Sequence, residues 1–336
     1  MTFRGVCESA FAILSPVAMC LIAGLAVAQS QTSATSPEST APELPSWAYP
    51  VRASRAPRPP DDGVKQHVPN STEGYTLMQI KDDFSVPDWY PADHPPMPRV
   101  VAHGSKPAGV RACGFCHLPN GRGLSENAPL AGLSAAYIVH QVAEFKSGLR
   151  KSSDSRRQPM TALVAMNVAD EDVQEAAQYF AAMKYQPWIR VVESETAPKT
   201  IPESGSLMPD QAGGTEPIGE RVIELPEEVE RRELRDSKSG FVAYVPPGSI
   251  RKGEALVTNG AGKTTPCGVC HGPDLKGVDD VPPLAGRSAI YVFRQLYDFQ
   301  SGARNGSLSP LMKSVVTKLT ISDMVEIAAY TASRTP

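Results

Sequence analysis

The chain has 336 residues, a formal net charge of -3 at pH 7 and a hydrophobic content of 41%. This length allows two domains of about 100 to 150 residues with connecting segments. The stretches 99–185 and 247–336 each contain ten basic and seven acidic residues. So small a positive excess excludes a nucleic-acid-binding protein, which requires a strongly basic face.

Residues 1–28 have the features of an export signal. Arg4 precedes a long apolar run, and residues 26–28 read AVA, the small-residue pattern of a cleavage site. We therefore expect a periplasmic protein whose mature chain begins near Gln29. The apolar run 11–28 is long for a signal core, so an uncleaved segment that associates with a membrane is the alternative.

Residues 29–98 are not expected to fold independently. The stretch 29–60 is rich in Ser, Thr, Pro and Ala, and it has too little apolar surface to offset the entropy of ordering, so we expect a flexible tether. Residues 61–98 combine aromatic side chains with many prolines. That composition favours an irregular arm that lies against a domain.

An internal repeat occupies much of the remaining chain. Residues 113–150 align without gaps on 267–304, so that CGFCHLPNGRG matches CGVCHGPDLKG and PLAGLSAAY matches PLAGRSAIY. Further matched pairs are Gln141 with Gln295, Phe145 with Phe299, and Arg150 with Arg304. The chain therefore contains two copies of one module, within the expected domains 99–185 and 247–336.

Each copy is predicted to be helical. Ser134 and Ser288 stand as N-caps before apolar and aromatic residues that recur at helical spacing. The other helices are expected at 99–103, 170–184, 249–258 and 322–333. Ser249 and Ser322 are the expected N-caps of the last two.

Residues 186–246 form an acidic linker between the copies. Extended segments are expected there, with one charged helix at 226–235 that begins at Pro226. The predicted fold class is therefore all-α, with two tandem domains of three to four helices each, joined by the linker and preceded by the irregular arm.

CGFCH and CGVCH match the C-x-x-C-H motif, in which two thiols bond covalently to haem vinyl groups and the His binds the iron. The candidate residues are Cys113, Cys116, His117, Cys267, Cys270 and His271. Thiol redox motifs or a four-thiolate zinc site are the alternatives for C-x-x-C alone, but a His directly after each pair argues against both. We expect two haem c groups.

With these motifs, the two modules resemble the class I c-type cytochromes. The tandem arrangement resembles the exported dihaem kind of the c-four type. The resemblance covers about 99–185 and 247–336, and it implies two tandem cytochrome c domains, each of which surrounds one haem.

The resemblance also implies the axial ligands of the iron. His117 and His271 are the proximal ligands, and the sixth ligand is a Met that precedes the last helix of each module. Met312 stands at that place in the second module and Met160 in the first. Met160 stands one residue ahead of the position that Met312 has in the second copy, and Met166, which lies closer to Tyr179, is its rival.

Two further features follow from the resemblance. A backbone carbonyl should accept a hydrogen bond from each proximal His, and the candidates are Pro129 and Pro283, or Ala128 and Pro282 in a second alignment. Gly253 and Tyr330 suit a close crossing of the first and last helices, although ordinary packing explains them equally. His140, a rival axial ligand, is expected on the exposed side of its helix.

A haem with both axial positions filled has no open site for a substrate, so no catalytic residue is predicted. We expect a carrier that passes single electrons between a dehydrogenase or membrane oxidoreductase and a terminal acceptor. The alternative is a dihaem enzyme, a peroxidase or a sulfur-compound oxidising enzyme, with one open or differently ligated haem. The acidic linker and the arm also suggest a docking subunit.

Overall fold

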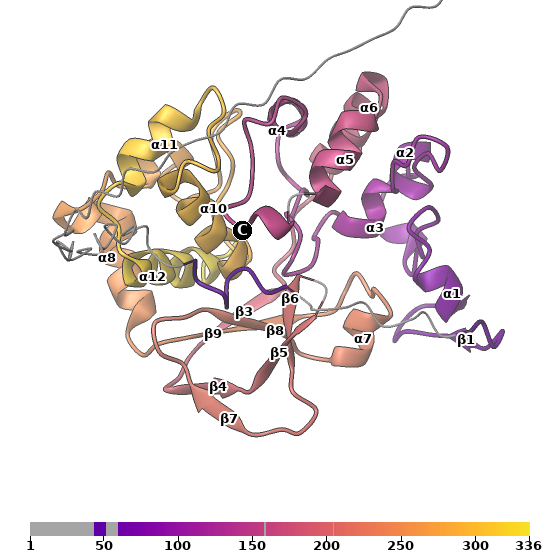
Figure 1. Ribbon diagram of the computed structural model, residues 1–336, viewed down its shortest axis with the longest axis horizontal. Coiled ribbons are helices and arrows are strands. Elements are labelled where there is room, and N and C mark those ends of the chain that lie inside the picture. The colour runs from indigo at the N-terminus through magenta and orange to yellow at the C-terminus, as the bar shows by residue number, and fades with distance from the viewer. Residues whose placement is uncertain (1–43, 52–59, 158, 204) are drawn as a thin grey trace, which may run out of the picture. The chain divides into compact units, whose positions relative to one another are not determined.

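The computed structural model describes residues 44–51, 60–157, 159–203 and 205–336. The expected export signal and most of the expected tether lie outside these residues. Leu44–Pro336 form one compact unit (Figure 1). In the described ranges, no helix is both long enough and apolar enough to cross a membrane.

The first module is helical, as predicted. Its helices are α2 (Arg99–Ala102), α3 (Cys113–His117), α4 (Ala135–Lys146), α5 (Pro159–Asn167) and α6 (Asp170–Ala181). Ser134 is the N-cap of α4, as expected, because its hydroxyl accepts a hydrogen bond from the Tyr137 amide at 3.0 Å. The last helix is shorter than predicted.

The second module repeats this arrangement. Its helices are α8 (Ser249–Asn259), α9 (Gly268–His271), α10 (Ala289–Gln300), α11 (Ser309–Val316) and α12 (Ile321–Ala332). The Ser288 hydroxyl caps α10 as predicted. The predictions for Ser249 and Ser322 are wrong. Gly248 precedes α8, and Thr320 caps α12 through a capping box with Asp323, which satisfies two backbone amides at once.

The linker contradicts the all-α prediction. Strands β3 (Ile189–Glu193), β8 (Ile223–Pro226) and β9 (Phe241–Val245) form a sheet in which β9 pairs parallel with β3 and antiparallel with β8 (Figure 1). Four short strands form two more pairs, β4 (Thr196–Pro198) with β7 (Thr215–Pro217), and β5 (Thr200–Glu203) with β6 (Ser206–Pro209). β-Branched and aromatic residues in β3 and β9 favour strands over helices.

The helix expected at 226–235 is limited to α7 (Val229–Glu233). Pro226 ends β8 instead of beginning the helix. The central sheet packs against both modules, because Phe241 belongs to the apolar core of the first module and Ala243 to that of the second. The linker is therefore a structural element shared by the two modules.

The expected tether is ordered over 44–51. The Trp47 ring lies 4.5 Å from the ring of Phe293 between centroids, and the Tyr49 hydroxyl donates to the Asp298 carboxylate at 2.8 Å. Residues 44–51 are therefore anchored on the second module, contrary to the expectation of a flexible chain. Their aromatic side chains supply the buried surface that the rest of the stretch lacks.

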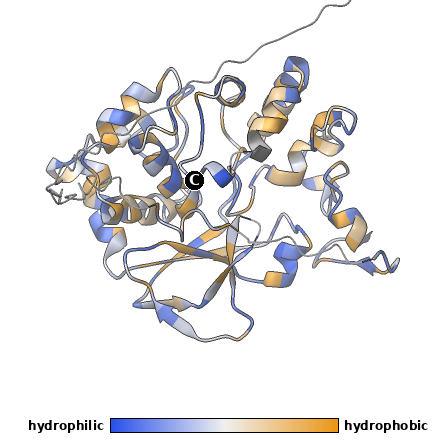
Figure 2. Ribbon diagram, in the orientation of Figure 1, coloured by the Kyte–Doolittle hydropathy of each residue, from blue (hydrophilic) through white to orange (hydrophobic). Residues whose placement is uncertain are grey.

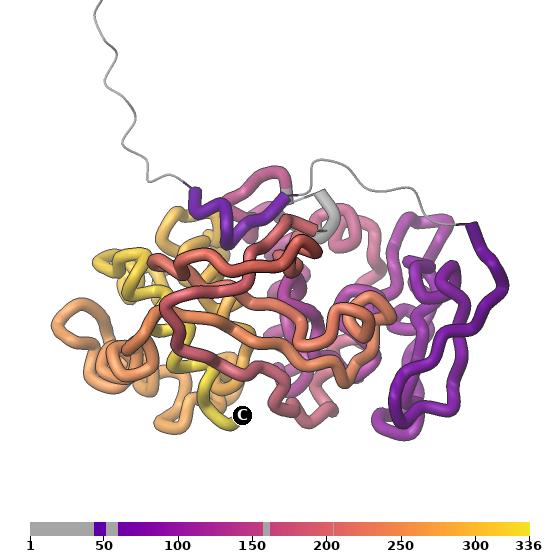
Figure 3. The backbone as a smooth tube through the Cα atoms, turned by 90° about the horizontal axis from the view of Figure 1, so that it is seen from below, coloured from indigo at the N-terminus to yellow at the C-terminus, as the bar shows by residue number. Residues whose placement is uncertain are grey.

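The arm contains β1 (Lys65–Gln66), β2 (Tyr75–Thr76), helix α1 (Leu77–Ile80) and a short 3-10 helix, η1 (Pro91–Asp93). It packs on the linker through a small core of its own that includes Trp89 and Leu234 (Figure 3). The Trp89 Nε1 donates to the Leu234 carbonyl at 2.8 Å. The arm therefore lies against the fold, as predicted, with α7 as one of its contacts.

The first and last helices of the second module cross closely at Gly253. A Cβ at this position would overlap the Glu326 carbonyl oxygen and lie 2.9 Å from the Cβ of Tyr330. The expectation of a small residue at this crossing is confirmed. In Figure 2 the helices carry both hydrophobic and hydrophilic residues, as helices that cover a core on one face do.

We call the motif helices α3 and α9, with the residues that follow them as far as Gly121 and Leu275, the attachment turns. The backbone follows the same path in both of them, although the side chains differ. Leu118 and Gly272 are matched positions and both have positive φ, at 62° and 82°. Gly121 and Leu275 are the next such pair, at 71° and 61°. Positive φ is costly for leucine. The shared conformation at these positions therefore reflects a constraint of the whole turn and not of one side chain.

Candidate functional site

The two motif histidines have the same hydrogen bond. His117 Nδ1 lies 2.8 Å from the Ala128 carbonyl oxygen, and His271 Nδ1 lies 2.7 Å from the Pro282 carbonyl oxygen. The acceptors are therefore Ala128 and Pro282, as the second alignment predicted, and not Pro129 and Pro283. A backbone carbonyl can only accept, so Nδ1 carries the proton and Nε2 offers its lone pair to a metal.

Burial shifts the pKa of several motif residues. Burial lowers the pKa of His117 and of His271, which keeps both rings neutral. Burial also raises the pKa of the Cys113 thiol to about 12 and that of Cys267 to about 11. Within the residues that the structure describes, none of the four motif cysteines forms a disulfide bond. His140 bonds to a serine hydroxyl of the second module, with its side chain 35% exposed.

The candidate methionines lie in short helices instead of in loops. Met160 lies in the first turn of α5, but its side chain is outside the described residues. Met312 lies in α11 and is partly buried against the core of the second module. Met166 is 56% exposed. The same two helices expose the apolar side chains of Leu163 and Leu311.

These features fit covalent haem. Each attachment turn offers two free thiols and a neutral, oriented imidazole. Within the described ranges, no three His, Cys, Asp or Glu side chains converge as a metal-binding group.

Comparison with known proteins identifies the family. No protein-family model matches the chain. Cytochrome c4 of Pseudomonas aeruginosa is 27% identical over 236 residues, which are 68% of this chain and 86% of that protein. Cytochrome c-554(548) of Halomonas halodenitrificans is 34% identical over 76 residues, which are 22% of this chain and 92% of that protein. The chain belongs to the class I c-type cytochromes.

Within that family the chain is of the tandem cytochrome c4 kind. A protein of Stutzerimonas stutzeri named thiosulfate dehydrogenase electron acceptor is 25% identical and covers 68% of this chain and 82% of its own length. This cytochrome is therefore an electron-transfer protein with haem c as its cofactor, and it acts with redox partners.

Matched residues from both modules meet at a junction. Arg150 donates to the side-chain oxygens of Gln141 at 2.7 Å and Gln295 at 3.0 Å. Arg304 donates to the same two oxygens, at 2.7 and 2.9 Å. The pKa of Tyr137 is lowered. Burial alone would raise it, but the positive charges of Arg304 and Arg150 have the larger combined effect. The repeat had already matched the two glutamines and the two arginines with each other, but the sequence did not predict that all four meet.

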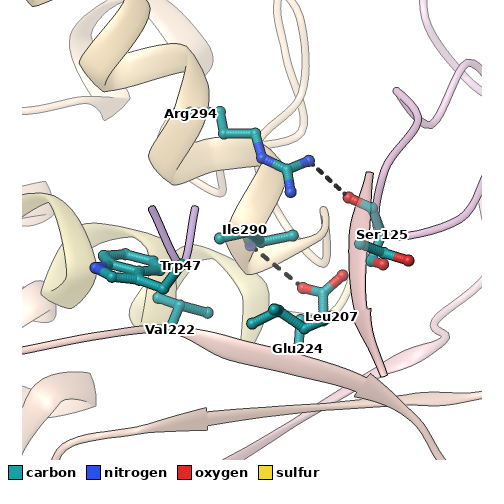
Figure 4. A pocket seen from close by; sticks show the side chains of 8 residues that line it. Trp47, Ser125, Leu207, Val222, Glu224, Ile290 and Arg294 are labelled. Carbon is teal, nitrogen blue, oxygen red and sulfur yellow. Dashed lines mark hydrogen bonds between the residues drawn. The ribbon is translucent and has the colours of Figure 1, made fainter. Parts of the chain in front are cut away.

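A small cavity lies where the linker meets both modules (Figure 4). It measures about 10 Å³, roughly the room of one water molecule. Glu224 of β8 accepts from the Ser288 hydroxyl at 2.7 Å and the Ile290 amide at 3.3 Å. Arg294 donates to the Ser125 carbonyl of the first module at 2.9 Å. The cavity is too small for a cofactor, and its polar residues join the modules to the sheet.

The surroundings of the two attachment turns differ. Phe115 in CGFCH is 9% exposed, whereas the matched Val269 in CGVCH is 72% exposed. The Arg235 guanidinium lies over the Phe115 ring, 3.9 Å from its centroid. Burial raises the pKa of the Cys116 thiol, and the charge of Arg235 is the largest opposing influence. Sequence reasoning missed Arg235, because no local pattern connects it with the motif.

Proposed function

We propose that this cytochrome carries two haem c groups and passes single electrons between redox partners. Haem 1 would bond covalently to Cys113 and Cys116, and haem 2 to Cys267 and Cys270. The observation that supports this most directly is the duplicated geometry of His117 and His271, whose Nδ1 atoms each donate to a carbonyl within 2.8 Å. Bound haem supplies one-electron redox chemistry at the iron.

Met160 and Met312 complete the proposal as sixth ligands, with Met166 as the rival in the first module. A thioether ligand favours the reduced iron relative to a second imidazole, which gives a comparatively high potential. Iron with both axial positions filled has no place for substrate, so the chain's residues hold, orient and shield the haem. No residue is assigned a catalytic role.

The proposed location is the periplasm, with residues 1–28 as the export signal. Residues 11–28 would allow membrane association if they were retained. The proposed electron donor is a dehydrogenase or membrane oxidoreductase, and a terminal acceptor oxidises the cytochrome. The relative named as the electron acceptor of thiosulfate dehydrogenase supports a dehydrogenase of an inorganic sulfur compound as one donor.

The test uses full-length protein matured with haem. The expected result is two haems per chain and no binding of carbon monoxide to the reduced protein. Met160→Ala and Met312→Ala should each open one haem to carbon monoxide, whereas Met166→Ala should not. A wild-type protein that binds carbon monoxide at one haem would instead support the enzyme, and one haem per chain would refute the proposal.

A further inference from the structure

One cation approaches the attachment turn of the first module. Phe115 and Val269 occupy the same position of the repeat, yet 9% of one side chain and 72% of the other are exposed. Arg235 lies over Phe115 at 3.9 Å. The linker therefore places a positive charge beside Cys116 of the first motif, while the matched position of the second motif faces solvent.

The backbone around Arg235 is held from both sides. Arg235 follows Leu234, the C-cap of α7, and has a positive φ of 57°, which is uncommon for a residue other than glycine. On one side, the preceding Leu234 carbonyl accepts from Trp89 of the arm at 2.8 Å. On the other, the Ser237 carbonyl accepts from Asn120 of the first module at 2.7 Å. These contacts maintain the position of Arg235.

Several charged side chains near Arg235 form ion pairs with one another. The neighbouring ion pairs are Arg111 with Asp83 at 3.0 Å, Arg232 with Glu126 at 2.9 Å, and Lys81 with Glu233 at 2.7 Å. Within the described part of the chain Arg235 has no such partner, and its buried Nε has no hydrogen-bond acceptor. Arg235 is therefore a positive charge beside the first motif that no carboxylate of the described residues pairs directly.

We propose that Arg235 raises the reduction potential of haem 1 above that of haem 2. The inference rests on the proposed function, since it requires a redox-active haem in each module. Reduction lowers the positive charge of the haem iron, so a nearby cation stabilises the reduced state, and more strongly where water is excluded. Electrons that reach haem 2 would then pass to haem 1.

The test is a spectroelectrochemical titration of the full-length protein with both haems. Arg235→Gln should lower the higher of the two potentials and leave the other unchanged, whereas Arg235→Lys keeps the charge and should retain most of the difference. Glu126→Gln removes a nearby negative charge and should raise the same potential. Met312→His lowers the potential of haem 2 and thereby identifies it.

The matched control is Arg334→Gln. Arg334 lies over the Tyr330 ring at 4.6 Å in the second module but is exposed, so both potentials should stay unchanged. If neither Arg235→Gln nor Glu126→Gln moves a potential, or if the potential of haem 2 moves, the inference is overturned. Binding of carbon monoxide by the wild type would refute the proposed function, and the effect of Arg235 would still be measured.

Discussion

Arg150 and Arg304 face each other across the junction of the modules, and each donates to a glutamine oxygen of both modules. Their backbones also meet in an antiparallel bridge. Each guanidinium further lies over a phenylalanine of its own module, Phe145 at 4.7 Å and Phe299 at 4.3 Å. The duplicated sequence therefore contributes the same three side chains twice to one interface.

Replacement of either shared glutamine should destabilise this junction. Gln141→Leu removes the oxygen that accepts from both Arg150 and Arg304, and the loss should be about 2 kcal/mol of unfolding free energy, because buried donors are left without acceptors. Gln295→Leu should have a similar effect. Chemical denaturation measures both, with the exposed Gln178→Leu as control. A loss confined to one of the two glutamines would contradict the symmetry of the junction.

Gly253→Ala should lower the unfolding free energy by about 2 kcal/mol or more. The added Cβ would overlap the Glu326 carbonyl, and such overpacking forces the two helices apart. Thr258→Ala, at an exposed position of the same helix, should change stability little. Thermal unfolding followed by circular dichroism compares the two, and equal midpoints would show that α8 and α12 do not cross this closely.

His94 should make stability depend on pH. The Asp88 carboxylate bonded to its Nε2 raises the pKa of His94, and the Pro95 carbonyl at Nδ1 and the charge of Asp93 act in the same direction, while burial opposes them. The Tyr179 hydroxyl also lies 3.0 Å from Nδ1.

Since the pKa is higher in the folded state, this contribution is complete below about pH 6.5 and is lost as pH rises through the folded pKa. His94→Gln should remove that part of the pH dependence. Denaturation of both proteins from pH 5.5 to 9 tests this, and parallel curves for the two would refute it.

Tyr49→Phe should weaken the anchoring of residues 44–51. The Tyr49 hydroxyl donates to Asp298 at 2.8 Å, and this carboxylate also accepts from the Ser153 hydroxyl at 2.6 Å. Loss of a buried hydrogen bond to a carboxylate should cost about 1 to 2 kcal/mol. Limited proteolysis should cut near residue 51 faster than in the wild type. Tyr244→Phe, a partly buried tyrosine of β9, serves as control.

Local signals predicted the modules well. The hydroxyls of Ser134 and Ser288 cap the helices that follow them, as their place before apolar periodic residues implied. The cap of α12 was missed because Thr320 and Asp323 form a box that begins two residues earlier. The linker was harder, since β9 gains its partners from residues about 18 and 52 positions away, which no short window contains.

In the candidate site too, the residues of a local motif could be predicted, and the residues placed by tertiary packing could not. The candidate attachment residues could be recognised in the sequence, because Cys116 and His117 are adjacent in a motif whose spacing serves one chemistry. The carbonyl that accepts the hydrogen bond from His117 could not be chosen from the sequence, because two alignments of the loop were possible. In the structure it is the carbonyl of Ala128. Arg235 could not be predicted, because its approach to Phe115 is set by the packing of α7 and the arm.

The difference between Phe115 and Val269 bears on how the duplicated halves can diverge. A substitution at Phe115 must remain compatible with the arginine above it and with the segment that presents that arginine. Position 269 is mostly exposed, so its side chain can change with little effect on the interior. Position 269 can therefore accept substitutions that position 115 accepts only with a compatible change at Arg235.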